Sequence, residues 1–547
     1  MKARVINAVQ KALERLAERW QLEELPAIIV EVPKNESFGD MATTVAMGLA
    51  PTLKQAPRKI AGEIVEKIKE VSHDFEQVDI AGPGFINFTF KEEFFRSGVE
   101  KILLQKHSEI DRTQGKGRSV LIEYVSANPT GPLHFGHGRG AAVGNALANM
   151  LEAAGWRVDK EFYINDAGRQ VELLGESVYS AYQSEFGVNA AFPEDGYKGD
   201  YIFDAARVLA AQEGDRFKNQ PFTACREFFV QWSTKTMLGE IKKVLDEFGI
   251  AFDRWQSEKA LFEQGKVNEV IEYLKEKNVS FESEGALWFR SSDFGDEKDR
   301  VLVKSDGTYT YFASDIALHK HKAEGGYDML INIWGADHHG YIPRIKAALS
   351  AFGFEPDRLK VLLVQMVTLL NKRKPVQMSK RAGSFITLKE VVDDVGPDIA
   401  KFIFLTRRPD SHLEFDLEVA KEESSENPVF YVQYANARIN SIMRKADPTL
   451  FDSFDLVHLT NKEEIGIMKK LCLYPVIFEG AVWALEPHRI TYYLQELSSL
   501  FHSYYNKHRV ISDDESLTRA RLAFCRAVQI VIREGLEILG VHIPERM

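Results

Sequence analysis

The pattern of apolar and polar residues divides the chain into three parts, of which the first covers residues 1–112. Apolar residues recur at helical spacing between Val5 and Leu16. Farther along, a Gly-Pro-Gly turn precedes residues 85–90, which alternate as in a strand. The mixture of helices and short strands predicts a compact α+β domain.

The second part, residues 113–424, has the pattern of a parallel sheet with crossover helices. Residues 119–125 form an apolar run typical of a buried strand, and a loop rich in turn residues follows. Small and apolar residues over 139–154 predict a helix that stops at a glycine, and 157–164 predict the next strand. A strand, a helix and a strand in this order imply parallel strands joined by a right-handed crossover.

Further segments elaborate this sheet. Residues from about 172 to 284 are mostly helical in pattern, which predicts an insertion between the two halves of the sheet. Asp306-Gly307 is a strong two-residue turn signal, so residues 300–305 and 308–312 are predicted to pair as a hairpin. Sheet strands resume at 328–334 and 361–367.

The third part, residues 425–547, is helical in pattern after Asn427-Pro428. Its last long helix carries one apolar stripe, formed by Leu522, Cys525, Val528, Ile532, Leu536 and Leu539. The whole pattern predicts a multidomain α/β protein. A Rossmann-like parallel-sheet domain with a helical insertion lies between an N-terminal α+β domain and an all-α C-terminal domain.

Composition narrows the class of protein. With 547 residues, 45% hydrophobic and 27% charged, the chain is ordinary for a globular protein with several cores. No apolar run reaches the roughly 18 residues of a membrane span, and the amphipathic N-terminus lacks the features of a signal peptide. Its three cysteines stand far apart, which predicts neither disulfides nor a zinc site. We therefore expect a cytoplasmic protein without a membrane partner.

The net charge of -11 makes a nucleic-acid partner less expected without excluding one, because a local basic surface still binds phosphates.

The loop SANPTGPLHFGHGRG places His134 and His137 just before the predicted helix start. Helix N-termini offer unpaired N–H groups and partial positive charge, which suits a triphosphate, and imidazoles can donate to phosphate oxygens. Gly136 and Gly138 would let the backbone approach a nucleotide closely. The alternatives are a plain glycine-rich turn, or a metal pair that lacks a nearby third ligand. The chain contains neither a P-loop nor a GxGxxG sequence.

A second element, NKRKPVQMSKRAGSF, gathers basic residues in a short polar loop after a predicted strand, namely Lys372, Arg373, Lys374, Lys380 and Arg381. Such a loop is suited to neutralising a pyrophosphate in a transition state. Its alternative is a solvated basic loop, which is how most charge runs end.

Together these elements resemble a known family. The first loop resembles the HIGH motif of class I aminoacyl-tRNA synthetases, and Met378-Ser379-Lys380-Arg381 resembles their KMSKS motif, in the expected order. The stretches IEYVSANPTGPLHFGHGR, GADHHGY, NPVFYVQYANARI and the terminal PERM are similar to arginyl-tRNA synthetases in particular. The resemblance implies an arginine–tRNA ligase that activates L-arginine with ATP and transfers it to tRNA(Arg).

The resemblance also implies an arginine site. Asp315 and Tyr311 would contact the guanidinium with Glu123 assisting, while Ser126 and Asn128 would hold the backbone groups of the amino acid. A guanidinium requires carboxylates and other acceptors, so the chemistry agrees. As structural alternatives, Ser314 or Asp315 would be a helix N-cap and Tyr311 a core aromatic. A carboxylate at Glu123 in an apolar strand needs a partner in either case.

The same resemblance assigns the ATP site. His134, His137 and Lys380 would stabilise the phosphates with Mg²⁺ carried by ATP, and Met378 and Ser379 would belong to the ATP loop. Gly335 and Asp337 would lie where this class binds the ribose, although a turn with a structural aspartate is the alternative.

One departure is that Gln377 replaces the first lysine of KMSKS, for which Lys372–Lys374 would compensate. Activation in this family commonly depends on bound tRNA, and we carry that dependence over as a hypothesis.

For tRNA, the C-terminal part resembles an anticodon-binding domain. Arg519, Arg526 and Arg533 share a helix face at seven-residue spacing and are candidates for phosphates, although most such stripes are solvated or ion-paired. The candidates for base stacking are Tyr434, Tyr504, Tyr505 and His508, although several of these aromatics must instead belong to the core. The N-terminal domain resembles a module that contacts the tRNA elbow, with Phe85, Asn87 and Phe90 as candidates, and packing is the favoured alternative for the two phenylalanines.

Three rival functions follow from the same residues: another class I synthetase for cysteine, lysine or glutamate, a small nucleotidyltransferase, and a non-catalytic RNA-binding relative. The specific match favours arginine, and the large helical domain is unneeded by a nucleotidyltransferase. We expect a monomer.

Overall fold

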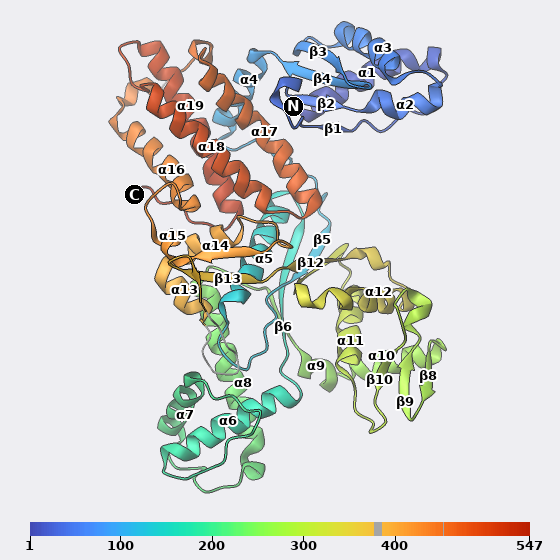
Figure 1. Cartoon of the computed structure of the whole chain (residues 1–547), viewed down its shortest axis with the longest axis vertical. Helices are drawn as coiled ribbons and strands as arrows, with labels where there is room; N and C mark the ends of the chain where they lie inside the picture. Colours follow the sequence, from blue (N-terminus) through green and yellow to red (C-terminus); the bar gives the residue numbers. More distant parts are fainter. Residues whose placement is uncertain (377–385, 452) are drawn as a thin grey trace.

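The centre of the molecule is a five-stranded sheet whose strands are all parallel (Figure 1). The computed structural model describes residues 1–376, 386–451 and 453–547. In space the strands follow the order β12-β11-β5-β6-β7. Their bounds are β5 Ser119–Glu123, β6 Arg157–Ile164, β7 Arg254–Ser257, β11 Met329–Gly335 and β12 Leu359–Val364.

Both faces of this sheet are covered, which explains why its central strands β5 and β11 are mostly apolar. Val120 and Ile122 of β5 join the large core beneath α5 (Phe135–Ala153), whereas Leu121 joins a second core beneath α11 (Tyr311–Glu324). Close packing dictates the small residues of α5. A Cβ atom at Gly144 would lie only 2.3 Å from the ring of Tyr124.

The strand order reverses direction between β5 and β11. The chain proceeds from β5 outward through β6 and β7, and then returns to the other side of β5 for β11 and β12. Loops that leave β5 and β11 therefore diverge at their carboxyl ends, which is where open α/β sheets bind ligands. The predicted HIGH-like loop starts at this point.

The segment between β6 and β11 adds two groups of helices and strands to the central sheet (Figure 1). Helices α6 (Arg169–Glu185), α7 (Asp200–Glu213) and α8 (Phe222–Glu247) share a core of their own. The second group comprises α9 Glu258–Glu263, α10 Lys266–Glu276, β8 Ser280–Ser283, β9 Ala286–Phe289, β10 Arg300–Val303 and the 3₁₀ turn η2 Ser291–Phe294. After β11, the turns η3 Ala336–Tyr341 and η4 Pro356–Arg358 flank α12 Ile342–Ala351, which packs against this group. The helical prediction for 172–284 missed β7 and β8, which have only four residues each.

The predicted hairpin is half present. Lys304 N donates to Thr308 O at 2.8 Å, so the chain does reverse at Asp306-Gly307. The return arm contributes one bridge, Tyr309 with Val303, because α11 begins at Tyr311. β10 instead pairs along its length with β9.

The N-terminal domain is α+β, as predicted. Its antiparallel sheet has the order β1-β2-β4-β3, with helices packed on it. The elements are α1 Lys2–Trp20, β1 Val30–Glu31, η1 Glu36–Phe38, β2 Met41–Thr43, α2 Val45–Leu53, α3 Pro57–Val71, β3 Phe75–Ala81, β4 Phe85–Phe90 and α4 Glu92–Gln105. Helix α4 packs against the C-terminal helices α17 and α19.

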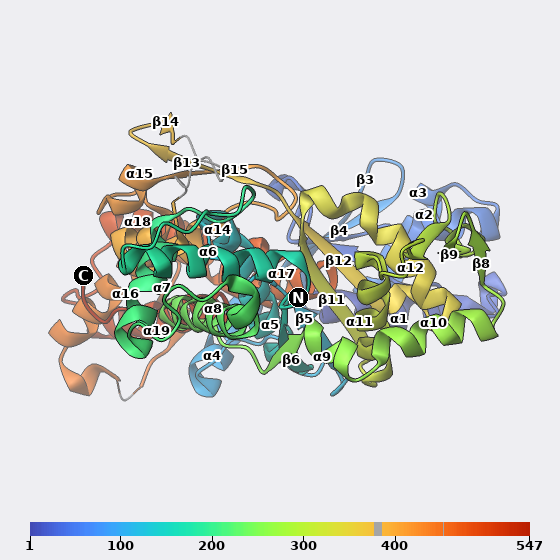
Figure 2. The same cartoon turned by 90° about the horizontal axis from the view of Figure 1, so that it is seen from below.

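The rest of the chain forms a small sheet and a helical bundle. β13 (Val367–Asn371) pairs with β14 (Lys374–Pro375) and β15 (Leu413–Asp416), and this hairpin stands out from the body in Figure 2. The helices are α13 Leu388–Val395, α14 Pro397–Phe404, α15 Leu417–Lys421, α16 Pro428–Lys445, α17 Lys462–Ala484, α18 His488–Lys507 and α19 Glu515–Ile538, with turns η5 Pro448–Phe451 and η6 Leu456–His458. All six residues of the predicted apolar stripe on α19 are buried.

The predicted fold class is thus confirmed. Within the described ranges, no helix has both the length and the apolarity of a membrane span.

Candidate active site

The loop that leaves β5 begins with two non-glycine residues in the left-handed region. Val125 has φ 67° and Ser126 has φ 41°. Such backbone conformations are rare for β-branched residues and need support from their surroundings. The Ser126 hydroxyl supplies it, since it donates to Glu123 Oε1 at 2.9 Å and accepts from Tyr163 N at 3.1 Å. The start of the loop is therefore held between β5 and β6.

The two predicted histidines lie at the N-terminus of α5. His134 is the N-cap residue, and its backbone N–H donates to His137 Nδ1 at 3.2 Å, while its side chain accepts from the backbone of His137. The rings stack with their centroids 3.5 Å apart. Because Nδ1 of His137 accepts a hydrogen bond, the proton of the neutral ring resides on Nε2.

Close packing within the protein also explains why glycine occupies positions 136 and 138 beside these histidines. A Cβ atom at Gly138 would lie 2.7 Å from Leu388 and 2.9 Å from Phe404, so this glycine lets α5 pack closely on α13 and α14. A Cβ atom at Gly136 would lie 3.0 Å from the ring of His134. Their predicted contact with ATP stays a prediction.

A buried arginine connects α5 with the β13 hairpin. Arg139 is fully buried and donates to the carbonyls of Gln365 (2.9 Å), Ser411 (2.7 Å) and Arg408 (2.8 Å). These carbonyls precede β13 and β15. Burial lowers the pKa of Arg139 to about 10. One side chain thus ties the histidine-bearing helix to the sheet that leads toward the KMSKS-like segment.

That segment, including Met378, Ser379 and Lys380, lies outside the described residues, as do Gln377 and Arg381. Before it, Lys372 and Arg373 form the left-handed turn between β13 and β14.

The predicted arginine pocket is centred on Asp315. Its carboxylate accepts a hydrogen bond from the Tyr341 hydroxyl at 2.6 Å. Burial raises the pKa of Asp315 to about 7, against the opposing effect of this hydrogen bond. The N-cap of α11 is Thr310, whose side chain accepts from Ala313 N, so Asp315 has no capping role. A half-buried carboxylate with a raised pKa is typical of a functional site.

A second buried carboxylate, Glu258, belongs to the same pocket. It opens α9, whose N-cap Ser257 donates to Asp166 Oδ2 at 2.7 Å. Burial raises the pKa of Glu258. Burial also raises the pKa of Tyr163, and the nearby carboxylates of Glu258, Asp315 and Glu123 raise it further. The tyrosine therefore lies among three acidic groups.

Glu123 is buried at the end of β5, where its partner is Lys322 of α11. Lys322 also lies 3.2 Å from Glu161, and Arg254 Nε lies 3.3 Å from the other oxygen of Glu161. Burial opposes ionisation of Glu123, but the charge and hydrogen bond of Lys322 outweigh it and lower the pKa. The partner that the sequence required is thus a lysine of the protein itself.

Two further buried side chains fix the frame around Asp315. His319 Nδ1 lies 2.7 Å from the Asp315 carbonyl, and Asn332 Nδ2 lies 2.7 Å from His319 Nε2. Burial lowers the pKa of His319 to about 4, so the ring is neutral at pH 7. Nδ1 then donates and Nε2 accepts, which joins α11 to β11 beside Glu123.

The other predicted substrate residues lie at the rim. Tyr311 is 64% exposed at the start of α11, four residues before Asp315. Asn128 Nδ2 donates to Gln170 Oε1 of α6 at 2.6 Å. After β11, Gly335 makes room for Asp337, because a Cβ atom there would lie 2.5 Å from Asp337 Oδ1. The side chain of Asp337 is largely exposed.

Sequence reasoning missed four of these residues: Lys322, Glu161, Glu258 and Tyr341. Lys322 had a usable signal, since it follows Asp315 by seven positions and so lies on the same face of one helix. Glu161 directly pairs with Glu123 across β5 and β6, and a carboxylate in each of two buried strands was also visible.

In the C-terminal bundle, two predicted aromatics enclose an arginine. The guanidinium carbon of Arg438 lies 4.6 Å from the ring centroid of Tyr434 and 4.5 Å from that of Tyr505. Both tyrosines are 37% exposed. Tyr504, in contrast, is buried with its hydroxyl on Glu464 at 3.2 Å, so its predicted stacking on RNA is wrong. We call the stacked cation and its two open rings the aromatic platform. Unpaired bases stack on surfaces of this kind, and its contact with tRNA stays a prediction.

The N-terminal candidates are less open. Phe90 is 2% exposed and packs on Phe75 and Phe94, with ring centroids 5.0 and 4.3 Å away. Asn87 is buried within β4. Both positions favour the packing alternative.

Among the described residues, no cluster of three or more histidine, cysteine, aspartate or glutamate side chains is arranged to hold a metal ion.

Three family models match the chain in succession. Residues 3–90 match the arginyl tRNA synthetase N terminal domain, 98–403 the catalytic domain of class I (R) tRNA synthetases, and 432–547 the DALR anticodon binding domain. An arginine–tRNA ligase of Geobacter sp. (strain M21) is 49% identical over 538 residues, which is 96% of each chain. The arginine–tRNA ligase of Syntrophotalea carbinolica is 46% identical over 556 residues and the full length of both.

Solved structures agree. A putative arginyl-tRNA synthetase from Campylobacter jejuni has a TM-score of 0.77 and 36% identity, over 84% of this chain and 100% of that one. The arginyl-tRNA synthetase of Thermus thermophilus shares the fold over 100% of both chains, with a TM-score of 0.79 and 21% identity.

Proposed function

Since the chain belongs to the arginyl-tRNA synthetase family, we propose how its residues divide the arginine–tRNA ligase reaction among them. The enzyme uses ATP to convert L-arginine into arginyl-adenylate and transfers the arginyl group to the 3′-terminal adenosine of tRNA(Arg). The rival assignments to another amino acid or to a small nucleotidyltransferase are thereby set aside.

In the first step, a carboxylate oxygen of arginine attacks the α-phosphorus of ATP, and the bond to the leaving pyrophosphate breaks. We assign His134 and His137 to the growing negative charge on the phosphates. Their support is their place at the N-terminus of α5, where the partial positive charge of the helix dipole acts in the same direction. Gly136, Gly138, Gly335 and Asp337 would line the rest of the nucleotide site.

Lys380, with Met378 and Ser379, would neutralise the pyrophosphate from the other side, and Mg²⁺ would enter with ATP as an additional counter-charge. Arg139 ties α5 to the segments before β13 and β15 through the three carbonyls that it binds. Chelation of Mg²⁺ should stop adenylate formation, whereas a zinc chelator should leave it intact.

Asp315 is the residue that we assign to the guanidinium. A carboxylate can bind it with two parallel hydrogen bonds, and Tyr341 already orients the carboxylate. Since Lys322 holds Glu123 and Glu161, these two acids act on arginine mainly through their charge. Neutral citrulline would leave Asp315 unpaired, and lysine lacks the planar fork.

The remaining substrate contacts follow from position. Tyr311 would cover the guanidinium from the rim, while Asn128 and the backbone at Ser126 would hold the amino and carboxylate groups of arginine. In the transfer step, the terminal ribose hydroxyl of tRNA attacks the adenylate carbonyl and AMP leaves. Tyr434 and Tyr505 would stack on anticodon bases, and Arg526 would contact phosphate.

At the tRNA elbow, the N-terminal domain would make the contact, with Asn87 and Phe90 supporting the contacting surface. We further propose a cytoplasmic monomer, in line with three unpaired cysteines.

The proposal depends on one observation: the half-buried carboxylate of Asp315 and the helix start with His134 and His137 lie at the same, carboxyl ends of the strands of one sheet. Aminoacylation of bulk tRNA with each labelled amino acid in turn should yield charging by arginine alone. Replacement of His137 by alanine should remove adenylate formation, and unchanged activation would contradict the assignment.

A pyrophosphate-exchange assay with and without tRNA tests the family's dependence on RNA. Full exchange without tRNA would refute that dependence for this enzyme.

A further inference from the structure

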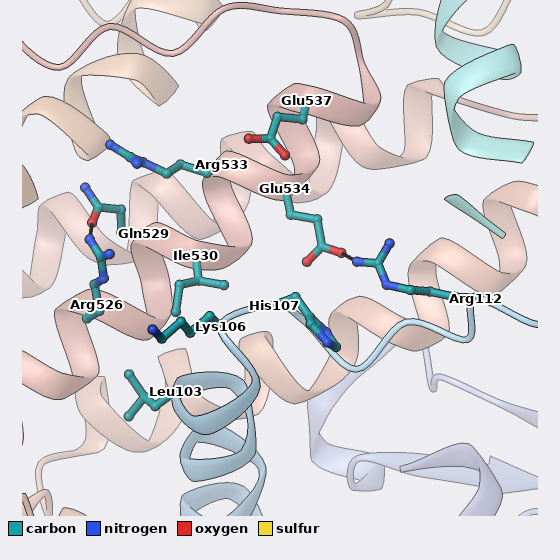
Figure 3. Close-up of a pocket in the computed structure, with 10 residues that line it drawn as sticks. All are labelled: Leu103, Lys106, His107, Arg112, Arg526, Gln529, Ile530, Arg533, Glu534 and Glu537. Carbon is teal, nitrogen blue, oxygen red and sulfur yellow. Dashed lines mark hydrogen bonds and ion pairs between the residues drawn. The ribbon is translucent and has the colours of Figure 1, made fainter. Parts of the chain in front are cut away.

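A cavity of about 440 Å³ lies between the connector after α4 and the last long helix, α19. Figure 3 shows the residues that surround it. Its lining is Leu103, Lys106, His107, Arg112, Arg526, Gln529, Ile530, Arg533, Glu534 and Glu537. The connector joins the N-terminal domain to β5, so this cavity lies where three parts of the chain meet.

The cavity holds an excess of positive charge. Four cationic side chains, Lys106, Arg112, Arg526 and Arg533, face two carboxylates, Glu534 and Glu537. This balance contrasts with the net charge of -11 of the whole chain. A concave cationic region on an acidic protein focuses its field toward anions.

Three of the four cations form no ion pair with these carboxylates. Glu534 accepts from Ser108 N at 2.7 Å and from Arg112 at 2.5 Å, so it is already engaged with the connector. Among the ion pairs of the described residues, Lys106, Arg526 and Arg533 take no part in any. These three side chains are called the cationic triad below.

Neutral groups fix the directions of the two arginines. Arg526 Nη1 donates to Gln529 Oε1 at 2.5 Å, and Arg533 Nε donates to Asn436 Oδ1 at 3.1 Å. Lys106 points toward Arg526 from the end of α4 in Figure 3. Burial lowers the pKa of Arg526, and the charge of Arg533 lowers it further. Two guanidinium groups are thus held within reach of each other's charge, which a bound anion would compensate.

We propose that this cavity binds a phosphate group through the cationic triad. Guanidinium groups bind phosphate oxygens through paired N–H donors, and the ammonium of Lys106 adds a third direction. The chemistry admits two sources, a phosphate of bound tRNA or a free phosphate. The tRNA source rests on the proposed anticodon role of the bundle, whereas binding of free phosphate does not.

The site differs from the aromatic platform of Tyr434 and Tyr505. Asn436, which binds Arg533, lies two positions after Tyr434 on α16, so the two side chains point to different sides of that helix. A phosphate in the cavity would bridge the connector and α19. It would therefore link the N-terminal domain to the bundle that carries the platform.

The test uses the full-length enzyme with Arg526→Gln/Arg533→Gln and, separately, Lys106→Gln. Arg489→Gln is the matched control, because Arg489 lies on a helix of the same bundle, α18, but already pairs with Glu486. Circular dichroism and urea unfolding verify that each variant folds. One arm measures the affinity for tRNA(Arg) against salt concentration, and the other measures the thermal shift produced by inorganic phosphate.

In the tRNA arm, the double variant should bind about tenfold more weakly, and its salt slope should fall by about 1 to 2. In the second arm, phosphate should stabilise the wild type and the control but not the triad variants. A change in either arm supports the site and identifies the source of the phosphate. Wild-type behaviour of the triad variants in both arms would overturn the proposal, and arginine charging measured in parallel tests the proposed function separately.

Discussion

Replacing Asp315 by asparagine removes one charge from the arginine pocket and keeps an oxygen that can accept from Tyr341. The pKa of Asp315 is about 7, compared with 3.8 for an ordinary aspartate. Because each pKa unit corresponds to about 1.4 kcal/mol, ionising this carboxyl in the folded enzyme costs about 4 kcal/mol. Asparagine avoids that cost.

The effect on stability has a definite sign. A carboxyl whose pKa is raised by folding stabilises the fold while it stays protonated, and this contribution is lost as pH rises from 3.8 to about 7. Asp315→Asn should therefore match the wild type near pH 4 and be more stable at pH 8, by at most about 4 kcal/mol. Urea unfolding of the arginine-free enzyme at the two pH values measures this difference.

Arginine binding should change in the opposite direction. Loss of a buried charged partner costs about 2 to 5 kcal/mol, so the Kd for arginine should rise by a factor of about 30 to 4,000. In the wild type, affinity should fall up to tenfold per pH unit below about 7, because Asp315 must be ionised to bind. Asp357→Asn is the control, since that carboxylate is 81% exposed and precedes β12, at the amino end of the strand and not at its carboxyl end. An asparagine variant that binds arginine within threefold of the wild type would refute the assignment.

Three further changes test other parts of the structure. Lys322→Met leaves Glu123 and Glu161 buried without their lysine, so the free energy of unfolding in urea should fall by about 3 to 5 kcal/mol. Adding Glu123→Gln/Glu161→Gln to this variant should restore part of the lost stability. A loss below about 1 kcal/mol would contradict this reasoning. Arg139→Met removes the hydrogen-bond donors of three carbonyls and should slow pyrophosphate exchange at least tenfold. Arg139→Lys should recover part of that rate. An unchanged rate in Arg139→Met would mean that packing alone positions the hairpin. Tyr505→Ala should raise the KM for tRNA about 5- to 150-fold, because a stacking surface for bases is lost. Tyr492 is a similarly exposed tyrosine of the same helix, and Tyr492→Ala should leave this KM unchanged. Equal effects of the two substitutions would argue against base stacking.

Local sequence was sufficient for the frame of the site. The apolar run of β5, the glycine-rich loop and the start of α5 follow each other directly, so their order along the chain fixed their place in space. The same holds for Asp315, whose position on a helix after a turn is a local property. The stripe on α19 was also predictable, because helical periodicity determines which side is buried.

The features of the site that could not be predicted depend on contacts between residues far apart in the sequence. Glu123 and Lys322 are 199 residues apart, and only the complete sheet with its helices brings them together. Short elements such as β7 carry too few residues for a pattern to emerge. Tyr504 and Tyr505 differ by one position, yet one is buried and the other open. Here the sequence did hold the answer, since Tyr504 continues the apolar face of Leu497 and Phe501.

The left-handed backbone at Val125 and Ser126 affects the entropy change when substrates bind in each catalytic cycle. A flexible loop would have to be ordered anew each time that substrates bind, and this entropy would weaken every encounter. Here the unfavourable conformation is imposed when the chain folds, by hydrogen bonds that join β5 and β6. The conformational entropy of this part of the loop is therefore lost when the chain folds, and not again each time that substrates bind. A glycine at Val125 would relax the turn, and the enzyme would gain stability while losing some of its readiness to bind.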